Sequence, residues 1–209
     1  MRSGFRPPRS RPARSDPPDL VPRLLKGEEA PFAAVVERWQ PGLLRLARSI
    51  TGSEASAEEV VQETWIAVLR SLGTFEGRSS LRTWVHRICA HLAFGRLRQD
   101  VRGPLAHEPS VDPARFDEGG EWRDPPAPWT EETPETLVTR RELVECIERT
   151  VVTLPVRQRV VITLRDVQGF SSEEACEILG VTEGHQRVLL HRARSRVRAA
   201  CERFYREAA

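Results

Sequence analysis

The chain has 209 residues, which is enough for one large domain or two small ones. Aromatic residues make up only 6% of the chain and 16 residues are proline, a composition that favours compact helical units separated by loops over one large sheet. The net charge of +2 hides a strong segregation into basic and acidic segments. Two basic zones on separate segments indicate two contacts with a polyanion.

The chain shows no sign of export or of membrane insertion. No apolar run approaches membrane-spanning length, and the Arg- and Pro-rich start lacks the apolar core of an export signal. The four cysteines are far apart and form no C-x-x-C pair, as expected for buried thiols in a reducing compartment: Cys89, Cys146, Cys176 and Cys201. We therefore expect a soluble, cytoplasmic protein.

Catalytic and metal sites are not indicated. His86, Cys89 and His91 are close in sequence, but on a helix His91 points away from the other two and no fourth ligand is near. The sequence contains no paired-carboxylate site, phosphate-binding loop or nucleophile motif. We expect a protein that is not an enzyme and that has no metal and no cofactor.

The first part of the chain predicts a tail followed by a helical domain. Residues 1–22 are rich in Pro, Arg and Ser and are expected to be a disordered basic tail, whereas residues 23–100 show strong helical periodicity. In the first long helix Pro41 is expected to bend or break the run. Ser56 and Glu59 form the pattern of a capping box that would open the next helix.

That helix and the one after it differ in charge. The first carries an acidic block without basic residues, Glu54, Glu58, Glu59 and Glu63. A loop over residues 75–80 precedes an Arg-rich helix whose apolar stripe contains Trp84. Trp84 is either a core residue or a platform on which a base could stack.

Residues 101–134 predict an acidic, Pro-rich linker, because helical periodicity disappears there. Trp122 and Trp129 are unusual in such a segment and either dock on a neighbouring surface or are incidental. Residues 135–209 form a second helical domain. The predicted fold is thus all-α, with two small helical domains joined by a flexible linker.

The most informative stretch lies at residues 169–182. Ser171 and Glu174 form a capping box, Gly180 is placed to end that helix in a left-handed conformation, and Thr182 can cap the next helix. A helix, a three-residue turn and a second helix make a helix-turn-helix, whose second helix enters the major groove of DNA. Arg can bind guanine there and Gln can bind adenine.

Several segments resemble the sigma-70 family of bacterial RNA polymerase sigma factors, in particular the extracytoplasmic-function (ECF) group. Residues 154–159, 164–169 and 190–194, together with the capped helix, resemble region 4. Residues 56–65 resemble region 2.2 and residues 75–88 resemble region 2.3. These motifs occur in the order that the family requires and are joined by a linker.

The resemblance implies three interaction surfaces. One acidic helix would dock on the β′ clamp helices of core RNA polymerase, through Glu58, Glu59, Gln62 and Glu63. The Arg-rich loop and helix would open and hold the −10 element of promoter DNA, through Arg78, Ser80, Arg82, Trp84, Arg87 and His91. The helix-turn-helix would touch the β flap and read the −35 element, through His185, Gln186, Arg187, His191 and Arg192.

The resemblance also implies regulation by an anti-sigma factor. In two places the chain departs from the family: His91 and Gly95 stand where Asn and Asp are usual, and Val188 and Leu189 stand where small or basic residues are common.

The alternative to a sigma factor is a stand-alone operator-binding regulator. Such a protein would share the helix-turn-helix but would not need the acidic helix and the Arg/Trp loop.

Overall fold

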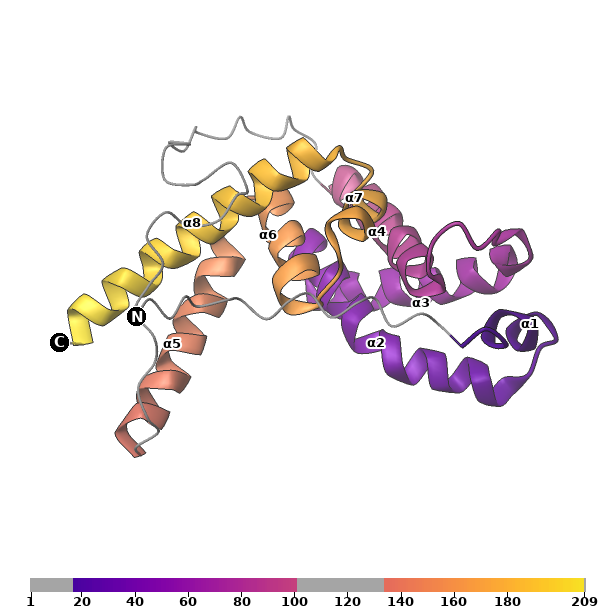
Figure 1. Ribbon diagram of the computed structural model, residues 1–209, viewed down its shortest axis with the longest axis horizontal. Coiled ribbons are helices and arrows are strands. Elements are labelled where there is room, and N and C mark those ends of the chain that lie inside the picture. Colours follow the sequence, from indigo (N-terminus) through magenta and orange to yellow (C-terminus); the bar gives the residue numbers. More distant parts are fainter. Residues whose placement is uncertain (1–16, 101–133, 209) are drawn as a thin grey trace, which may run out of the picture.

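The computed structural model describes residues 17–100 and 134–208, and within these ranges every regular element is a helix (Figure 1). The N-terminal unit consists of α1 (Leu20–Leu25), α2 (Glu29–Thr51), α3 (Glu54–Ser71), a short 3-10 turn (Leu72–Thr74) and α4 (Leu81–Asp100). The C-terminal unit consists of α5 (Pro134–Thr153), α6 (Val156–Ile162), a π-helical turn (Thr163–Val167), α7 (Ser172–Leu179) and α8 (Glu183–Ala208). The prediction of an all-helical fold is confirmed. Trp122 and Trp129 lie outside the described residues, as do the basic arginines of the first 16 residues.

The N-terminal unit is a bundle in which α2, α3 and α4 pack on one another. Helix α2 continues through Pro41, so the predicted break does not occur. Trp39 and Leu43 on either side of it are buried, and their packing offsets the hydrogen bond that proline cannot donate. Pro41 itself is exposed, on the side where water can reach the freed carbonyl.

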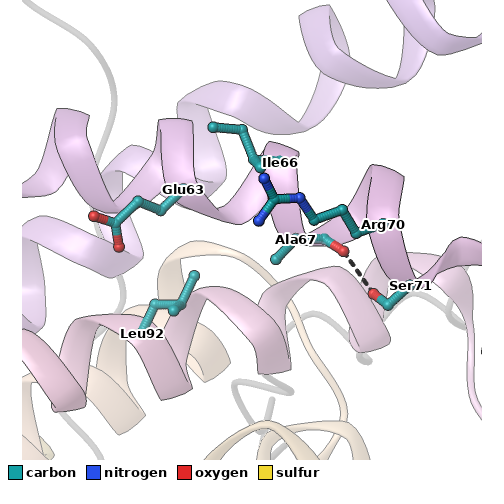
Figure 2. A pocket seen from close by; sticks show the side chains of 6 residues that line it. All are labelled: Glu63, Ile66, Ala67, Arg70, Ser71 and Leu92. Atoms are coloured by element: carbon teal, nitrogen blue, oxygen red, sulfur yellow. Dashed lines mark hydrogen bonds between the residues drawn. The ribbon is translucent and has the colours of Figure 1, made fainter.

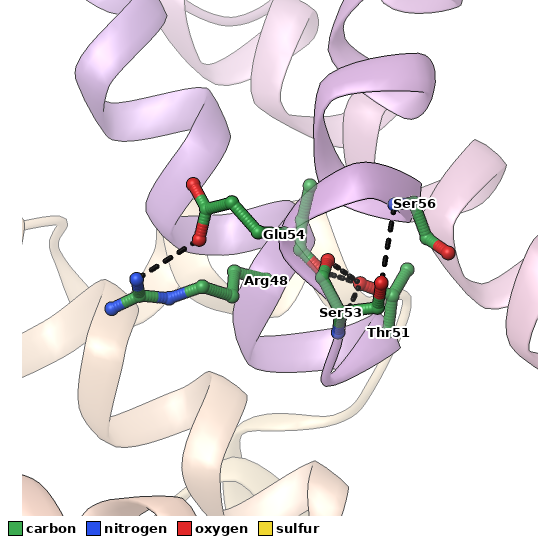
Figure 3. Close-up of polar contacts among 6 residues, drawn as sticks. Arg48, Thr51, Ser53, Glu54 and Ser56 are labelled. Atoms are coloured by element: carbon green, nitrogen blue, oxygen red, sulfur yellow. Dashed lines mark hydrogen bonds and ion pairs between the residues drawn. The ribbon is translucent and has the colours of Figure 1, made fainter.

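The start of α3 differs from the prediction by one turn (Figure 3). Gly52 ends α2 at a φ of 75°, and the next residue, Ser53, already caps α3 by accepting a hydrogen bond from the Ser56 amide at 3.4 Å. The predicted cap at Ser56 is therefore wrong. Arg48 pairs with Glu54 at 3.0 Å and links the two helices beside this turn.

The helix-turn-helix forms as predicted. Ser171 and Glu174 make both hydrogen bonds of the capping box, and Gly180 ends α7 at a φ of 63°, in the left-handed region that favours glycine. The Thr182 hydroxyl accepts a hydrogen bond from the His185 amide at 3.3 Å and so caps α8. Helix α8 is long, and its second half packs against α5 (Figure 1).

The two units share a hydrophobic core. The cluster that contains Leu43 and Leu81 of the N-terminal unit also contains Leu164, Phe170 and Ile178 of the C-terminal unit. A second cluster lies within the C-terminal unit, between α6 and α8. Helices α6 and α7 therefore lie between two cores, with α7 against α4 (Figure 1).

Candidate nucleic-acid and polymerase interfaces

The acidic side chains of α3 lie on its solvent face. Glu58, Glu59, Gln62 and Glu63 are all exposed, because the apolar stripe of the helix turns the opposite face into the bundle. Glu59 forms an ion pair with Arg96 of α4, so it also links two helices of the unit. Glu63 is separate from that pair and faces a neighbouring groove.

This groove is an apolar surface that the sequence analysis missed. Glu63, Ile66, Ala67, Arg70 and Ser71 of α3 line it, and Leu92 of α4 closes its other side (Figure 2). Ile66 is 48% exposed, and Leu69 on the same helix is 59% exposed. Both lie outside the apolar stripe that fills the core. Apolar residues in such positions were the sequence feature from which this surface could have been predicted. An exposed apolar patch that is rimmed by polar residues often marks a surface that binds another protein.

The α4 face and the loop before it carry the six residues predicted to bind the −10 element. Arg78, Arg87 and His91 are exposed, whereas Ser80, Arg82 and Trp84 are half-buried. Ser80 caps the helix by accepting a hydrogen bond from the Thr83 amide at 3.0 Å. Arg78 pairs with Glu76 in the loop. Five of the six lie in the loop and the first two turns of α4, and His91 lies one turn further along.

Trp84 has the surroundings of a packing residue. Its ring lies 5.3 Å from that of Phe75, and it packs at the edge of the shared core. Because it is only half-buried, one side of the indole remains accessible. The structure thus places Trp84 at the boundary between the two roles that the sequence left open.

At the start of α8 the predicted −35 contacts divide into three groups by exposure. His185 and Arg187 are exposed, and His191 and Arg192 are half-buried. Burial, followed by the nearby charge of Arg192, lowers the pKa of His191. Gln186 is only 2% exposed. Its Oε1 accepts a hydrogen bond from the Ser172 hydroxyl at 3.0 Å, which ties α8 to α7.

His86 lies at the junction of the two units. Its ring centroid is 4.8 Å from that of Phe170, and its Nδ1 is 2.8 Å from the Arg82 carbonyl. Burial lowers the pKa of His86 to about 4. His91, by contrast, is exposed, so these two histidines do not converge on one site.

Comparison with known proteins decides the family. The sequence matches the family descriptions "Sigma-70 region 2" over residues 35–103 and "Sigma-70, region 4" over residues 144–197. It is 32% identical to the ECF RNA polymerase sigma-E factor of Escherichia coli K12 over 179 residues, 85% of this chain and 90% of that one. It is 30% identical to the RNA polymerase sigma-H factor of Pseudomonas aeruginosa over 189 residues, 90% of this chain and 95% of that one.

The chain belongs to the sigma-70 family, in its ECF group. As an ECF sigma factor it directs promoter-specific initiation of transcription, and it is not an enzyme. In residues 17–100 and 134–208 no helix has the length and apolar character needed to cross a bilayer.

Two solved structures resemble the fold of this ECF sigma factor. One is CnrH in complex with the cytosolic domain of CnrY, with a TM-score of 0.56 and 23% identity over 88% of this chain and 95% of that one. The other is the sigma factor RpoE in complex with the anti-sigma factor NepR from Bartonella quintana, with a TM-score of 0.56 and 22% identity over 82% of this chain and 96% of that one. At this level of identity the likeness shows the fold.

Proposed function

We propose that three surfaces divide the work of this sigma factor. The exposed α3 face docks on the β′ clamp helices of core RNA polymerase, the α4 face holds the −10 element, and the start of α8 reads the −35 element while its unit touches the β flap. The first domain begins with α1 at Leu20, inside the segment 1–22 that was predicted as a tail, and extends to residue 100. The second domain is residues 135–209, and the acidic linker joins the two. The protein works in the cytoplasm, where an anti-sigma factor controls it.

The observation that carries this proposal is the presentation of His185 and Arg187 at the start of a capped recognition helix. Both side chains are exposed, and both lie in the first turns, the part of a helix-turn-helix that reaches base edges. The buried Gln186 supports these two residues by fixing α8 on α7. Direct contacts to bases are accordingly assigned first to His185 and Arg187, with His191 and Arg192 further along the helix.

The docking role of α3 is supported by the combination of charge and apolar surface. Glu58, Gln62 and Glu63 supply the polar part, and Ile66 and Leu69 supply apolar area that water would leave on binding. Control by an anti-sigma factor is suggested by one structure of similar fold, in which the sigma factor RpoE from Bartonella quintana is bound to the anti-sigma factor NepR. A stand-alone operator-binding regulator would need neither this surface nor the match to region 2.

The decisive experiment is run-off transcription on a promoter library with purified core polymerase, with and without the protein. We expect initiation at a defined subset of promoters only when both are present, and no specific footprint from the protein alone. Core polymerase alone is the control for background initiation. A specific footprint by the isolated protein, with no effect on core polymerase, would show that the stand-alone reading is correct.

A further inference from the structure

The face of α4 that we assign to −10 DNA is covered by α7 of the C-terminal unit. The Thr83 hydroxyl donates a hydrogen bond to Glu174 Oε1 at 2.9 Å, and Thr83 is fully buried. One helical turn further along α7, Glu177 Oε1 lies 4.0 Å from Arg87 Nη1. Two carboxylates thus face the polar and cationic side of α4.

An aromatic ring lies beside these carboxylates. The Phe170 ring is fully buried, and the Arg82 guanidinium stacks over it with 3.9 Å between its carbon and the ring centroid. Arg82 Nη2 also donates a hydrogen bond to the Gln168 carbonyl at 3.0 Å. Arg82 is therefore engaged by a flat ring and a backbone oxygen of the other unit.

Proteins hold single-stranded DNA by binding its phosphates with cationic side chains and by stacking on its flat bases. Two carboxylates and one phenyl ring offer the same two features to α4. We propose that Phe170, Glu174 and Glu177 form an internal mimic of single-stranded DNA, which occupies the −10 binding face of α4 in the free protein. The inference rests on the assignment of that face to −10 DNA in the proposed function. DNA and the mimic exclude each other, because both need Arg82 and Arg87.

The fit between the units extends beyond the mimic itself. Gln168 Nε2 donates a hydrogen bond to the Gly42 carbonyl at 3.0 Å, and Arg159 Nε donates one to the Ser49 carbonyl at 2.6 Å. A Cβ atom on Gly42 would lie 3.2 Å from Gln168 Oε1 and 3.4 Å from His86 Nε2. Glycine at position 42 therefore permits the close approach of the two units.

The test removes the negative charges of the mimic and leaves α4 unchanged. In the Glu174→Gln/Glu177→Gln variant the amide oxygen at 174 can still accept the Ser171 amide hydrogen bond of the capping box, which measures 2.8 Å. The matched control is Glu142→Gln/Glu148→Gln, which removes two exposed carboxylates from α5, away from the surfaces assigned to DNA. A second variant, Gly42→Leu, adds a side chain on α2 that separates the two units by steric contact, and it alters no charge.

The probe is a fluorescein-labelled, mixed-sequence single-stranded DNA 15-mer, and its binding to the full chain is followed by fluorescence anisotropy at fixed salt. Small-angle scattering measures the radius of gyration of each protein. We expect both test variants to bind the probe at least about fivefold more tightly than wild type. The first loses a hydrogen bond to a charged group from the closed form, and Gly42→Leu disfavours the closed form by steric contact with Gln168 and His86. Their radius of gyration should rise, and the control should match wild type.

Equal affinity of wild type and both test variants for the probe would overturn the mimicry and leave the proposed function intact. Variants that expand but do not bind DNA would also overturn the mimicry. Their exposed α4 face would then not be a surface that binds the −10 element. Run-off transcription with wild type and core polymerase decides the proposed function independently of either result.

Discussion

His86 is buried where the two units pack together, and this packing determines its protonation state. It lies between the Arg82 carbonyl and the Phe170 ring, and burial lowers its pKa to about 4. The charge of Arg82 also lowers the pKa of His86, while Gln168 and Phe170 face the ring from the C-terminal unit without charge. The folded protein therefore holds His86 in its neutral form.

Stability should consequently fall in acid. The contribution of neutral His86 is complete above the unfolded pKa of about 6.5 and is lost as the pH falls towards the folded pKa of about 4. Between pH 7 and pH 4.5 the free energy of unfolding should decrease by about 2 kcal/mol through this residue. Urea unfolding of wild type and His86→Gln at both pH values measures it. An equal acid loss in the two proteins would contradict the assignment.

Arg187 is expected to read sequence, in contrast to Arg198 three turns further along α8. Arg187→Ala should cost about 1–3 kcal/mol at promoters with the preferred base and should relax the preference at one position of the −35 element. Arg198 pairs with Glu202 at 2.7 Å, so Arg198→Ala should weaken all promoters alike or have no effect. Transcription from a −35 library at fixed salt compares them. A uniform loss with Arg187→Ala would refute base reading by this residue.

Glu63 is the cleanest probe of polymerase docking, because Glu59 also pairs with Arg96 within the unit. Glu63→Lys should weaken association with core polymerase by about tenfold or more, since it places like charges opposite each other if the partner surface is basic. Folding should change little, as expected for an exposed position. Glu148→Lys, exposed on α5, is the control in the same competition assay. Unchanged binding of Glu63→Lys would move the docking surface elsewhere.

Residue roles could be predicted where they depend only on the side of a helix. The exposure of Glu63 and Arg187 followed from the apolar stripes of their own helices. Gln186 lies four and seven residues before Leu190 and Ala193, so the periodicity of α8 places it on the buried face, which the sequence analysis did not use. What the periodicity could not give is its partner, the Ser172 hydroxyl on the other side of the turn.

At the scale of elements, local signals predicted α7 and α8 well and the start of α3 less well. The capping box at Ser171 and the left-handed Gly180 are decided by a few adjacent residues. In α3 two serines three residues apart compete for the cap, and Gly52 decides in favour of Ser53 by ending α2 one residue earlier. The continuation of α2 through Pro41 depends on tertiary packing, which overrides a local helix breaker.

The two glycines of the helix-turn-helix should respond oppositely to alanine. Gly180 has a φ of 63°, so Gly180→Ala should cost about 1 kcal/mol or more of unfolding free energy although no atom lies within 4 Å of the added Cβ. Gly184 has equal room in a helical conformation, and Gly184→Ala should stabilise by up to about 1 kcal/mol. Urea unfolding of both variants at one pH measures the difference. The same sign for both would show that backbone conformation does not dominate here.

At the scale of the whole molecule, the sequence predicted two helical domains but not their contact. The apolar stripe of each helix accounts for the core of its own unit, and nothing local assigns Phe170 or Leu164 to the other unit. The packing depends on residues more than 80 positions apart, such as Arg82 and Gln168. The π-helical turn at Thr163–Val167, which leads directly into Gln168, was also not foreseen.

Cleavage of the predicted linker tests this packing. A protease should cut within residues 103–135, of which 103–133 lie outside the described residues, and should leave two helical fragments. Because the units share a hydrophobic core, the two fragments should co-elute in size-exclusion chromatography under native conditions. Fragments that elute separately would show that the shared core contributes little to association.

The contact between α7 and α4 also affects the concentration at which the protein becomes active. Any partner that needs the two units apart binds only the open fraction of molecules, and its apparent dissociation constant is the intrinsic one divided by that fraction. For an open fraction of about one in a hundred, the apparent affinity is about a hundredfold weaker. Substitutions at Gly42 or Glu177 would therefore shift the cellular concentration at which transcription begins, while every surface that meets polymerase or the −35 element stays the same.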